Sequence, residues 1–331
     1  MSSPSLSLIS RVEVERALPV ERCLALARVA YEALANGRAL GSSLGQVVAP
    51  DGIFHVKGSG LYIDERLFVS VKVVAYFEQR PEMLGLPSTV GLIQLFDGAS
   101  GQPLAVMEAE YITNVRTAAG TAVALDCLAR ADAGRLLVCG VGSQALPHVE
   151  AIAAIRDLES VQLWGRSHAR AEVTASALRV RLPYLSVETV DDVAVAAGDA
   201  NLIVCLTPAT SPYLSVANIR PGTTIAAVGS DTPEKRELSI DLLVESTLVC
   251  DVTHQCATVG ELHHALDARV MTLDDVRAEI GQVLVGNANG RMSNDEVVVF
   301  DSTGTAVQDT APAAAVYLST RAAQVTDLWV T

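Results

Sequence analysis

Residues 136–145 read LLVCGVGSQA, a run of four apolar residues followed at once by a glycine-rich turn. The apolar run is typical of a buried strand, and the residues after the turn favour a helix over 144–155. In a strand–turn–helix unit, Gly140 permits the tight turn, Gly142 lets a phosphate approach the backbone, and Ala145 lets helix and strand pack closely. The spacing G-x-G-x-x-A therefore predicts a dinucleotide-binding turn, with a purely structural glycine turn as the alternative. The expected cofactor contacts are Gly140, Val141, Gly142, Ser143, Gln144 and Ala145.

Short apolar segments alternate with helical ones through the region that follows. This alternation predicts a parallel, doubly wound sheet with right-handed crossovers, so the fold class is α/β with a Rossmann-type sheet. The expected strands are Leu136–Cys139, Val161–Trp164, Leu202–Leu206, Thr224–Val228, Leu248–Cys250 and Val297–Phe300, with a second helix over 168–178.

The N-terminal third has a different pattern. Its expected elements are a helix over 12–36, a strand over 67–77 with Lys72 in its middle, a hairpin of strands 90–96 and 104–109, and a helix over 114–130. An alanine-rich helix over 306–323 is expected to return to this part of the chain. The predicted division is therefore 1–117 with 306–331 as a discontinuous α+β domain, and 118–305 as the Rossmann dinucleotide-binding domain.

The composition excludes several classes of protein. The 331 residues suffice for two domains, half are hydrophobic and only 19% are charged, which does not fit a disordered, collagen-like or coiled-coil chain. A net charge of −14 disfavours partners such as nucleic acid or anionic membranes. The six cysteines include no C-x-x-C pair, and we find no signal peptide and no apolar span. We expect a cytoplasmic protein with a small-molecule substrate.

The end of the second Rossmann strand indicates which dinucleotide binds. NAD-binding folds usually place an acidic residue there for the ribose 2′-hydroxyl. Here Trp164 is followed by Gly165, Arg166 and Ser167, with Arg170 one helical turn later. Guanidinium groups favour a 2′-phosphate, so NADP(H) is favoured over NAD(H). The alternative is that these arginines are solvated surface residues.

Several segments together resemble the ornithine cyclodeaminase/mu-crystallin family. They are Lys72 in its strand, Ile112-Thr113-Asn114-Val115-Arg116-Thr117-Ala118-Ala119, the glycine turn, Ala227-Val228-Gly229-Ser230-Asp231 with Arg236-Glu237-Leu238, and residues 300–309, FDSTGTAVQD. The resemblance covers roughly residues 56–317. It implies a homodimer formed through the non-Rossmann domain, which would make that domain responsible for substrate binding and dimerisation.

The resemblance also implies roles for three charged residues. Arg116 matches the arginine that holds a substrate carboxylate, Lys72 matches a catalytic-site lysine, and Asp231 matches the aspartate that exchanges a proton with the substrate nitrogen. Each has a simpler alternative: an interdomain salt bridge, an exposed strand lysine, and a cap of the following turn.

Further cofactor contacts follow from the same resemblance and from positions at strand ends. They are Ser88, Thr89, Thr117, Thr207, Val228, Ser230, Ser302, Thr303 and Gly304. One departure is that many relatives carry a second substrate-binding arginine early in the chain, whereas residues 41–46 contain none. His55 or Lys57 is the expected replacement.

One further segment contains several possible metal ligands. His254, Cys256, Glu261, His263 and His264 match no established zinc spacing and are expected to lie on an exposed polar helix. We therefore expect no metal.

Taken with the resemblance, the residues favour an NAD(P)H-dependent reductase of imino acids such as Δ1-pyrroline-2-carboxylate or Δ1-piperideine-2-carboxylate. Three alternatives remain open. They are an ornithine or lysine cyclodeaminase with tightly bound NAD+, an alanine-dehydrogenase-like enzyme, and a non-enzymatic crystallin-like ligand binder.

Overall fold

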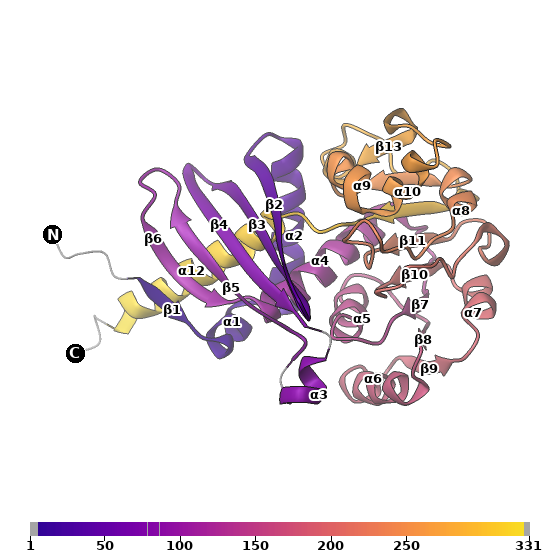
Figure 1. Ribbon diagram of the computed structural model, residues 1–331, viewed down its shortest axis with the longest axis horizontal. Coiled ribbons are helices and arrows are strands. Elements are labelled where there is room, and N and C mark those ends of the chain that lie inside the picture. The colour runs from indigo at the N-terminus through magenta and orange to yellow at the C-terminus, as the bar shows by residue number, and fades with distance from the viewer. Residues whose placement is uncertain (1–5, 78, 86, 328–331) are drawn as a thin grey trace. The chain divides into compact units, whose positions relative to one another are not determined.

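The computed structural model describes residues 6–77, 79–85 and 87–327. The chain divides into two compact units: unit 1 comprises residues 1–116 and 305–331, and unit 2 comprises residues 117–304. Figure 1 labels the elements of both. The roles assigned from the sequence to 1–117 with 306–331 and to 118–305 stay predictions.

Unit 1 contains a six-stranded sheet in the order β1-β6-β5-β4-β3-β2. Its strands are β1 (Ser7–Ile9), β2 (Ala39–Ala49), β3 (Gly52–Ile63), β4 (Arg66–Tyr76), β5 (Thr89–Asp97) and β6 (Pro103–Glu108). All neighbouring strands are antiparallel except β1 and β6, which are parallel. Strands β4, β5 and β6 match the three strands expected here.

Helices of unit 1 pack on one face of this sheet. They are α1 (Arg11–Ala17), α2 (Val20–Ala35) and α12 (Val307–Asp327). The unit also contains the short helix α3 (Arg80–Leu84), which follows β4, and the start of α4 (Glu110–Leu128), which follows β6. Helix α12 contacts β3, β4 and β5, and it also packs against α2 (Figure 1). The alanine-rich helix therefore returns to this part of the chain, as expected.

The expected single helix over 12–36 is wrong, because the structure has two helices there. A proline disfavours helical geometry at the residue before it. Leu18, which precedes Pro19, leaves the helical region at φ −125° and ψ 64° and ends α1, while Pro19 is the N-cap of α2.

Unit 2 contains an eight-stranded, wholly parallel sheet in the order β13-β12-β14-β11-β10-β7-β8-β9. Its strands are β7 (Arg135–Cys139), β8 (Ser160–Trp164), β9 (Ser186–Val190), β10 (Leu202–Cys205), β11 (Thr224–Ala227), β12 (Thr247–Cys250), β13 (Val276–Glu279) and β14 (Val298–Asp301). The chain order reverses between β7 and β10, and open α/β sheets bind ligands at such a point. This confirms the Rossmann-type prediction.

Two strands of unit 2, β9 and β13, were not expected. Both lie at the edges of the sheet and carry polar residues: β9 reads SVETV and β13 reads VRAE. The central strands are buried along their length, which produces the continuous apolar runs that sequence analysis detects.

The remaining helices of unit 2 are mostly short. They are α5 (Ala145–Ala153), α6 (His168–Arg181), α7 (Val193–Asp199), α8 (Ile240–Val244), α9 (Thr253–Val259), α10 (Glu261–Asp267) and α11 (Ile280–Leu284), with 3₁₀ turns Val216–Asn218 and Leu273–Asp275. The segment 254–264 is not an exposed polar helix. It forms α9 and α10, and its Cys256 and Glu261 are fully buried.

Within the described ranges, no helix has both the length and the apolar character needed to cross a bilayer.

Candidate functional site

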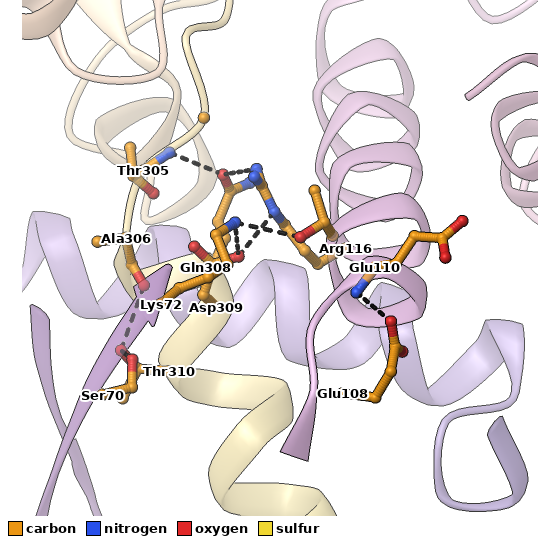
Figure 2. Close-up of polar contacts among 12 residues, drawn as sticks. Ser70, Lys72, Glu108, Glu110, Arg116, Thr305, Ala306, Gln308, Asp309 and Thr310 are labelled. Carbon is orange, nitrogen blue, oxygen red and sulfur yellow. Dashed lines mark hydrogen bonds and ion pairs between the residues drawn. The ribbon is translucent and has the colours of Figure 1, made fainter. Parts of the chain in front are cut away.

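A buried cluster of charged residues lies in unit 1, where β4, α4 and α12 contribute one charged side chain each (Figure 2). The Nζ atom of Lys72 lies 2.8 Å from Oδ1 of Asp309, and the Nε atom of Arg116 lies 3.0 Å from the same oxygen. Lys72 also donates to the hydroxyl of Thr113 at 3.2 Å. Two cations therefore share one carboxylate oxygen.

Local contacts fix the elements that carry this cluster. Helix α4 begins where the backbone N–H of Glu110 donates to Glu108, and Figure 2 shows this cap. The first turn of α12 is fixed by a hydrogen bond between the hydroxyls of Ser70 and Thr310, at 2.7 Å. The Gln308 side chain accepts from the N–H of Thr305 at 3.1 Å. The three charged side chains therefore belong to a strand and two helices whose positions are fixed by these hydrogen bonds.

Burial makes the electrostatics of this cluster strong. The side chains of Lys72, Arg116 and Asp309 are 3%, 8% and 1% exposed. Burial lowers the pKa of Lys72 to about 7, with Asp309 opposing this effect and Arg116 adding to it. Burial alone would raise the pKa of Asp309, but Arg116 and Lys72 outweigh it and lower that pKa. Asp309 is therefore an anion, and the amine of Lys72 titrates near neutrality.

Sequence analysis did not single out Asp309. The residue ends the segment FDSTGTAVQD on which the resemblance partly rests, yet only the loop before it received roles. A usable signal was present, because two basic residues predicted to share a buried site require an acidic partner.

The two residues expected to replace the missing arginine lie on the same face of the sheet as Lys72. Lys57 on β3 is directly opposite Lys72 on β4, and His55 is directly opposite Val74. The imidazole of His55 lies 3.5 Å from the amide of Gln46 on β2. Lys57, His55, Lys72 and Arg116 are all in unit 1, so the structure places the predicted substrate-binding residues in the same unit.

The glycine turn of unit 2 has the geometry that a dinucleotide requires. Gly140 has φ +110°, and a Cβ built there would lie 2.8 Å from the carbonyl oxygen of Leu206. A Cβ on Gly142 would meet nothing within 4 Å, so the turn is open at the position where a phosphate would approach. Ala145 is fully buried and begins α5. The turn follows β7, beside the point where the strand order reverses.

The loop after β8 presents basic groups to solvent. Arg166 in this loop and Arg170 in the first turn of α6 are both exposed. The hydroxyl of Ser167 accepts from the N–H of Arg170 at 3.3 Å and caps α6. A Cβ on Gly165 would lie 2.6 Å from Val141, so this loop packs closely on the glycine turn.

Buried carboxylates organise the loops at the carboxyl ends of the other strands. Glu237 accepts from the N–H and hydroxyl of Thr207, each at 2.7 Å, from Tyr213 at 2.8 Å and from the N–H of Gly229 at 2.8 Å. The hydroxyl of Ser230 donates to the carbonyl of Lys235 at 2.6 Å. The predicted cofactor contacts at Thr207 and Ser230 thus have fixed side chains.

Asp251 has the same function for the loop after β14. It accepts from the N–H of Gly304 at 2.7 Å, from Ser302 at 3.2 Å and from Thr303 at 3.3 Å. Burial raises the pKa of both Asp251 and Glu237, and the hydrogen bonds, which lower it, offset only part of this effect. Neither carboxylate received a role from the sequence, although Glu237 lies in a segment that carries the resemblance, because each acts through contacts with loops that are distant in the sequence.

Asp231 lies after β11 and is 43% exposed at its side chain. Its Oδ1 atom forms an ion pair with Lys235 at 2.5 Å. The expected proton-exchanging carboxylate is thus accessible and paired within its own loop.

The other predicted contacts lie at element boundaries. The carbonyl of Ser88 accepts from Phe77 at 2.9 Å, and Thr89 begins β5, both in unit 1. In unit 2, the N–H of Val228 donates to Cys205 at 3.0 Å, and Thr117 follows Arg116 on α4.

One group of possible metal ligands occurs among the described residues: Cys250, Cys256 and Asp301, whose ligand atoms lie within 4.8 Å of one another. Burial raises the pKa of Cys256 well above its usual value and that of Asp301 to about 7. Both residues are fully buried, and the Sγ atom of Cys256 donates to Asp251 at 3.3 Å and to the carbonyl of Asp301 at 3.4 Å, so we interpret the group as part of the core.

Comparisons with known proteins agree with this geometry. The model of the ornithine cyclodeaminase/mu-crystallin family matches residues 7–324. A protein of Rhizobium meliloti named as a dehydrogenase is 32% identical over 320 residues, covering 96% of this chain and 97% of the relative.

Two solved structures are similar over nearly the whole chain. An archaeal alanine dehydrogenase dimer with bound NAD is 28% identical, with a TM-score of 0.90, and covers 96% of this chain and 97% of its own. The Thermococcus litoralis Δ1-pyrroline-2-carboxylate reductase, in complex with NADH and L-proline, is 28% identical with a TM-score of 0.89, covering 95% and 97%.

Proposed function

The chain belongs to the ornithine cyclodeaminase/mu-crystallin family, and from this premise we propose that it is an NAD(P)H-dependent reductase of imino acids. Relatives in this family are nicotinamide-dependent reductases, dehydrogenases and cyclodeaminases, so an enzyme of this class is established. The proposed substrate type is Δ1-pyrroline-2-carboxylate or Δ1-piperideine-2-carboxylate.

The observation that carries the proposal is the sharing of Asp309 by Lys72 and Arg116. The contacts described for Lys72 use two of its three N–H donors. Arg116 approaches Asp309 through Nε and donates from Nη1 to Gln308 at 3.5 Å, and its guanidinium has further N–H donors. A substrate carboxylate matches this pair, because a guanidinium fork and an ammonium both bind carboxylate oxygens well. The site would hold the substrate by its carboxylate and orient it for reaction.

The residues of unit 2 fit a nicotinamide dinucleotide. The open position at Gly142 and the N-terminus of α5 would hold the pyrophosphate, and the loops at Thr207, Ser230 and 302–304 would contact the rest. When bound, the reduced cofactor supplies a hydride to the imine carbon.

Three side chains would then complete the reduction. As the C=N bond becomes a C–N single bond, its electron pair passes to nitrogen. Asp231 would deliver to that nitrogen the proton that balances the added hydride and would then be reprotonated from solvent. Arg116 would hold the carboxylate, and Lys72 would stabilise the charge that changes at the reacting centre. Lys57 or His55 would provide the contact that relatives obtain from a second arginine.

NADPH is the proposed form of the cofactor. Arg166 in the loop after β8 and Arg170 in the first turn of α6 are both exposed, and a ribose 2′-phosphate would lie beside this loop. Solved relatives hold NAD or NADH, so this preference is a proposal about this chain.

We also propose a homodimer formed through unit 1. One face of its sheet carries α12, whereas the other exposes Val73 and Leu92, the latter 53% exposed and directly opposite Val73 in register. An apolar sheet face of this kind favours burial against a second copy.

Deamination of an amino acid such as alanine is the second candidate, favoured by the similarity to the alanine dehydrogenase structure. An ornithine or lysine cyclodeaminase with tightly bound NAD+ and a ligand-binding protein without turnover complete the alternatives.

One set of assays separates these functions. Reduced-nicotinamide absorbance should fall on addition of pyrroline-2-carboxylate, faster with NADPH than with NADH. Cofactor reduction by L-alanine, or ammonia release from ornithine without net cofactor change, would replace the proposal with the corresponding alternative. Tight NADPH binding without turnover of any imino acid would indicate a ligand binder.

A further inference from the structure

The chain contains very few lysines. Lys57, Lys72 and Lys235 are the only three in the sequence, against 21 arginines. Arginine stays charged in proteins, whereas a buried lysine amine can lose its proton near neutral pH. Two of the three lysines, Lys57 and Lys72, are directly opposite each other on β3 and β4. Two titratable amines therefore lie next to each other in unit 1, beside the buried charges of Arg116 and Asp309.

The Asp309 cluster does not have the composition of a simple structural ion pair. Two buried cations face one buried carboxylate, and both approach the same oxygen. The other oxygen, Oδ2, has no hydrogen-bond partner among the described residues. A surplus buried positive charge is costly, and the carboxylate of a bound substrate would neutralise it. The cluster therefore favours binding of an anionic ligand such as a substrate carboxylate.

We propose that Asp309 is the positioning residue of this site: it holds the ammonium of Lys72 and the guanidinium of Arg116 at a fixed spacing and keeps the Lys72 amine charged against the repulsion of Lys57. This inference rests on the proposed function, because it concerns the same substrate carboxylate. Asp309 acts through Lys72 and Arg116 and need not touch the substrate itself.

The groups that face the Lys72 amine come from three elements. Asp309 on α12 favours its charged form, while Arg116 on α4 and Lys57 on β3 disfavour it, and burial disfavours it most. Thr113 on α4 contributes a neutral hydroxyl. Loss of the Asp309 charge leaves two repelling cations and no buried anion, so the amine should lose its proton at lower pH.

The scarcity of lysine allows a direct measurement. Protein labelled with ¹³C,¹⁵N-lysine should give three side-chain signals, which Lys57→Arg and Lys235→Arg assign. In the wild-type protein the Lys72 signal should titrate near pH 7. In Asp309→Asn its midpoint should fall by about one pH unit or more, since an opposite charge at this distance shifts a pKa by about 1–3 units.

A control variant removes a neighbouring contact between β4 and α12 without changing charge. Ser70→Ala removes the hydrogen bond to Thr310, next to Asp309 on α12, and should leave the Lys72 midpoint unchanged. Equal midpoints in the wild-type protein and Asp309→Asn would overturn the proposal, and so would an equal fall in Ser70→Ala.

A second variant separates position from charge and serves if Asp309→Asn does not fold. Asp309→Glu keeps the carboxylate but displaces it by one methylene, so the Lys72 midpoint should stay near 7 while turnover falls at least about tenfold. Full turnover in Asp309→Glu would refute the positioning role.

The turnover assays distinguish this proposal from the proposed function. In Asp309→Asn the loss of imino-acid reduction should be larger at pH 8 than at pH 6, while NADPH affinity stays unchanged. The lysine titration needs no substrate, so it still tests Asp309 if no imino acid is reduced. If imino acids are reduced but the Lys72 midpoint is the same in Asp309→Asn and the wild-type protein, the proposed function stands and the role of Asp309 is withdrawn.

Discussion

Lys72 and Asp309 are 237 positions apart in the sequence, yet the Nζ atom of one lies 2.8 Å from Oδ1 of the other inside the same buried site. The contact joins the middle strand of unit 1 to a helix that the chain forms only after completing unit 2. Correct placement of the predicted catalytic lysine therefore depends on the last helix of the chain.

The two glycines of the dinucleotide turn should respond differently to alanine. Gly140→Ala puts a Cβ on a residue at φ +110° and 2.8 Å from a carbonyl oxygen, so it should lower the unfolding temperature. Gly142→Ala meets no protein atom within 4 Å and should keep that temperature, while weakening cofactor binding at least about tenfold because the methyl occupies the phosphate position. Calorimetry and NADPH titration measure both effects. Unchanged affinity in Gly142→Ala would mean that the phosphates lie elsewhere.

Arg166 should select between the two cofactors. Arg166→Asp replaces a cation by an anion at an exposed position, so it should weaken NADPH binding at least about tenfold and affect NADH much less. Fluorescence titration with each cofactor measures the ratio, and Arg181→Asp, at the C-terminal end of α6, is the control for general charge. Equal losses for NADPH and NADH would show that Arg166 does not contact the 2′-phosphate.

Asp301 predicts a pH dependence of stability. Burial raises its pKa from 3.8 to about 7, so the folded protein binds a proton that the unfolded chain has released. This contribution to stability is fully present below about pH 4 and is lost as the pH rises to 7. The free energy of unfolding of the wild-type protein, relative to Asp301→Asn, should therefore fall between pH 5 and pH 7 and change little above. Urea titrations at these pH values measure it, and a constant difference would contradict the prediction.

Leu92 tests the proposed dimer. Leu92→Glu places a charge in the exposed apolar face of the unit 1 sheet, so it should shift the protein towards monomers without unfolding it. Light scattering gives the mass, and Val180→Glu, at an exposed apolar position of α6 in unit 2, is the control for added charge. A dimer of unchanged strength in Leu92→Glu would place the interface elsewhere.

Local patterns in the sequence were sufficient for the parts of the fold that local physics controls. The strand and turn at 136–145, and the hairpin around Asp97, follow from apolar runs and turn residues and are present as expected. The break at Pro19 could have been predicted from the proline itself. The edge strands β9 and β13 could not, because half-exposed strands lack a continuous apolar run.

Of the candidate site, the residue types were predictable and their partners were not. Lys72 is conspicuous as a lysine among the apolar residues of its strand, and Arg116 through the family resemblance, and the structure buries both. Asp309, Glu237 and Asp251 act over long sequence separations, and nothing in their immediate sequence shows which group each would contact.

Glu237 has a mechanical consequence. One carboxylate accepts hydrogen bonds from Thr207 in the loop after β10 and from Gly229 in the loop after β11, so the two loops cannot shift independently. A substitution in one loop should therefore disturb the order of the other loop. If either loop moves when a ligand binds, both should move together as one rigid body.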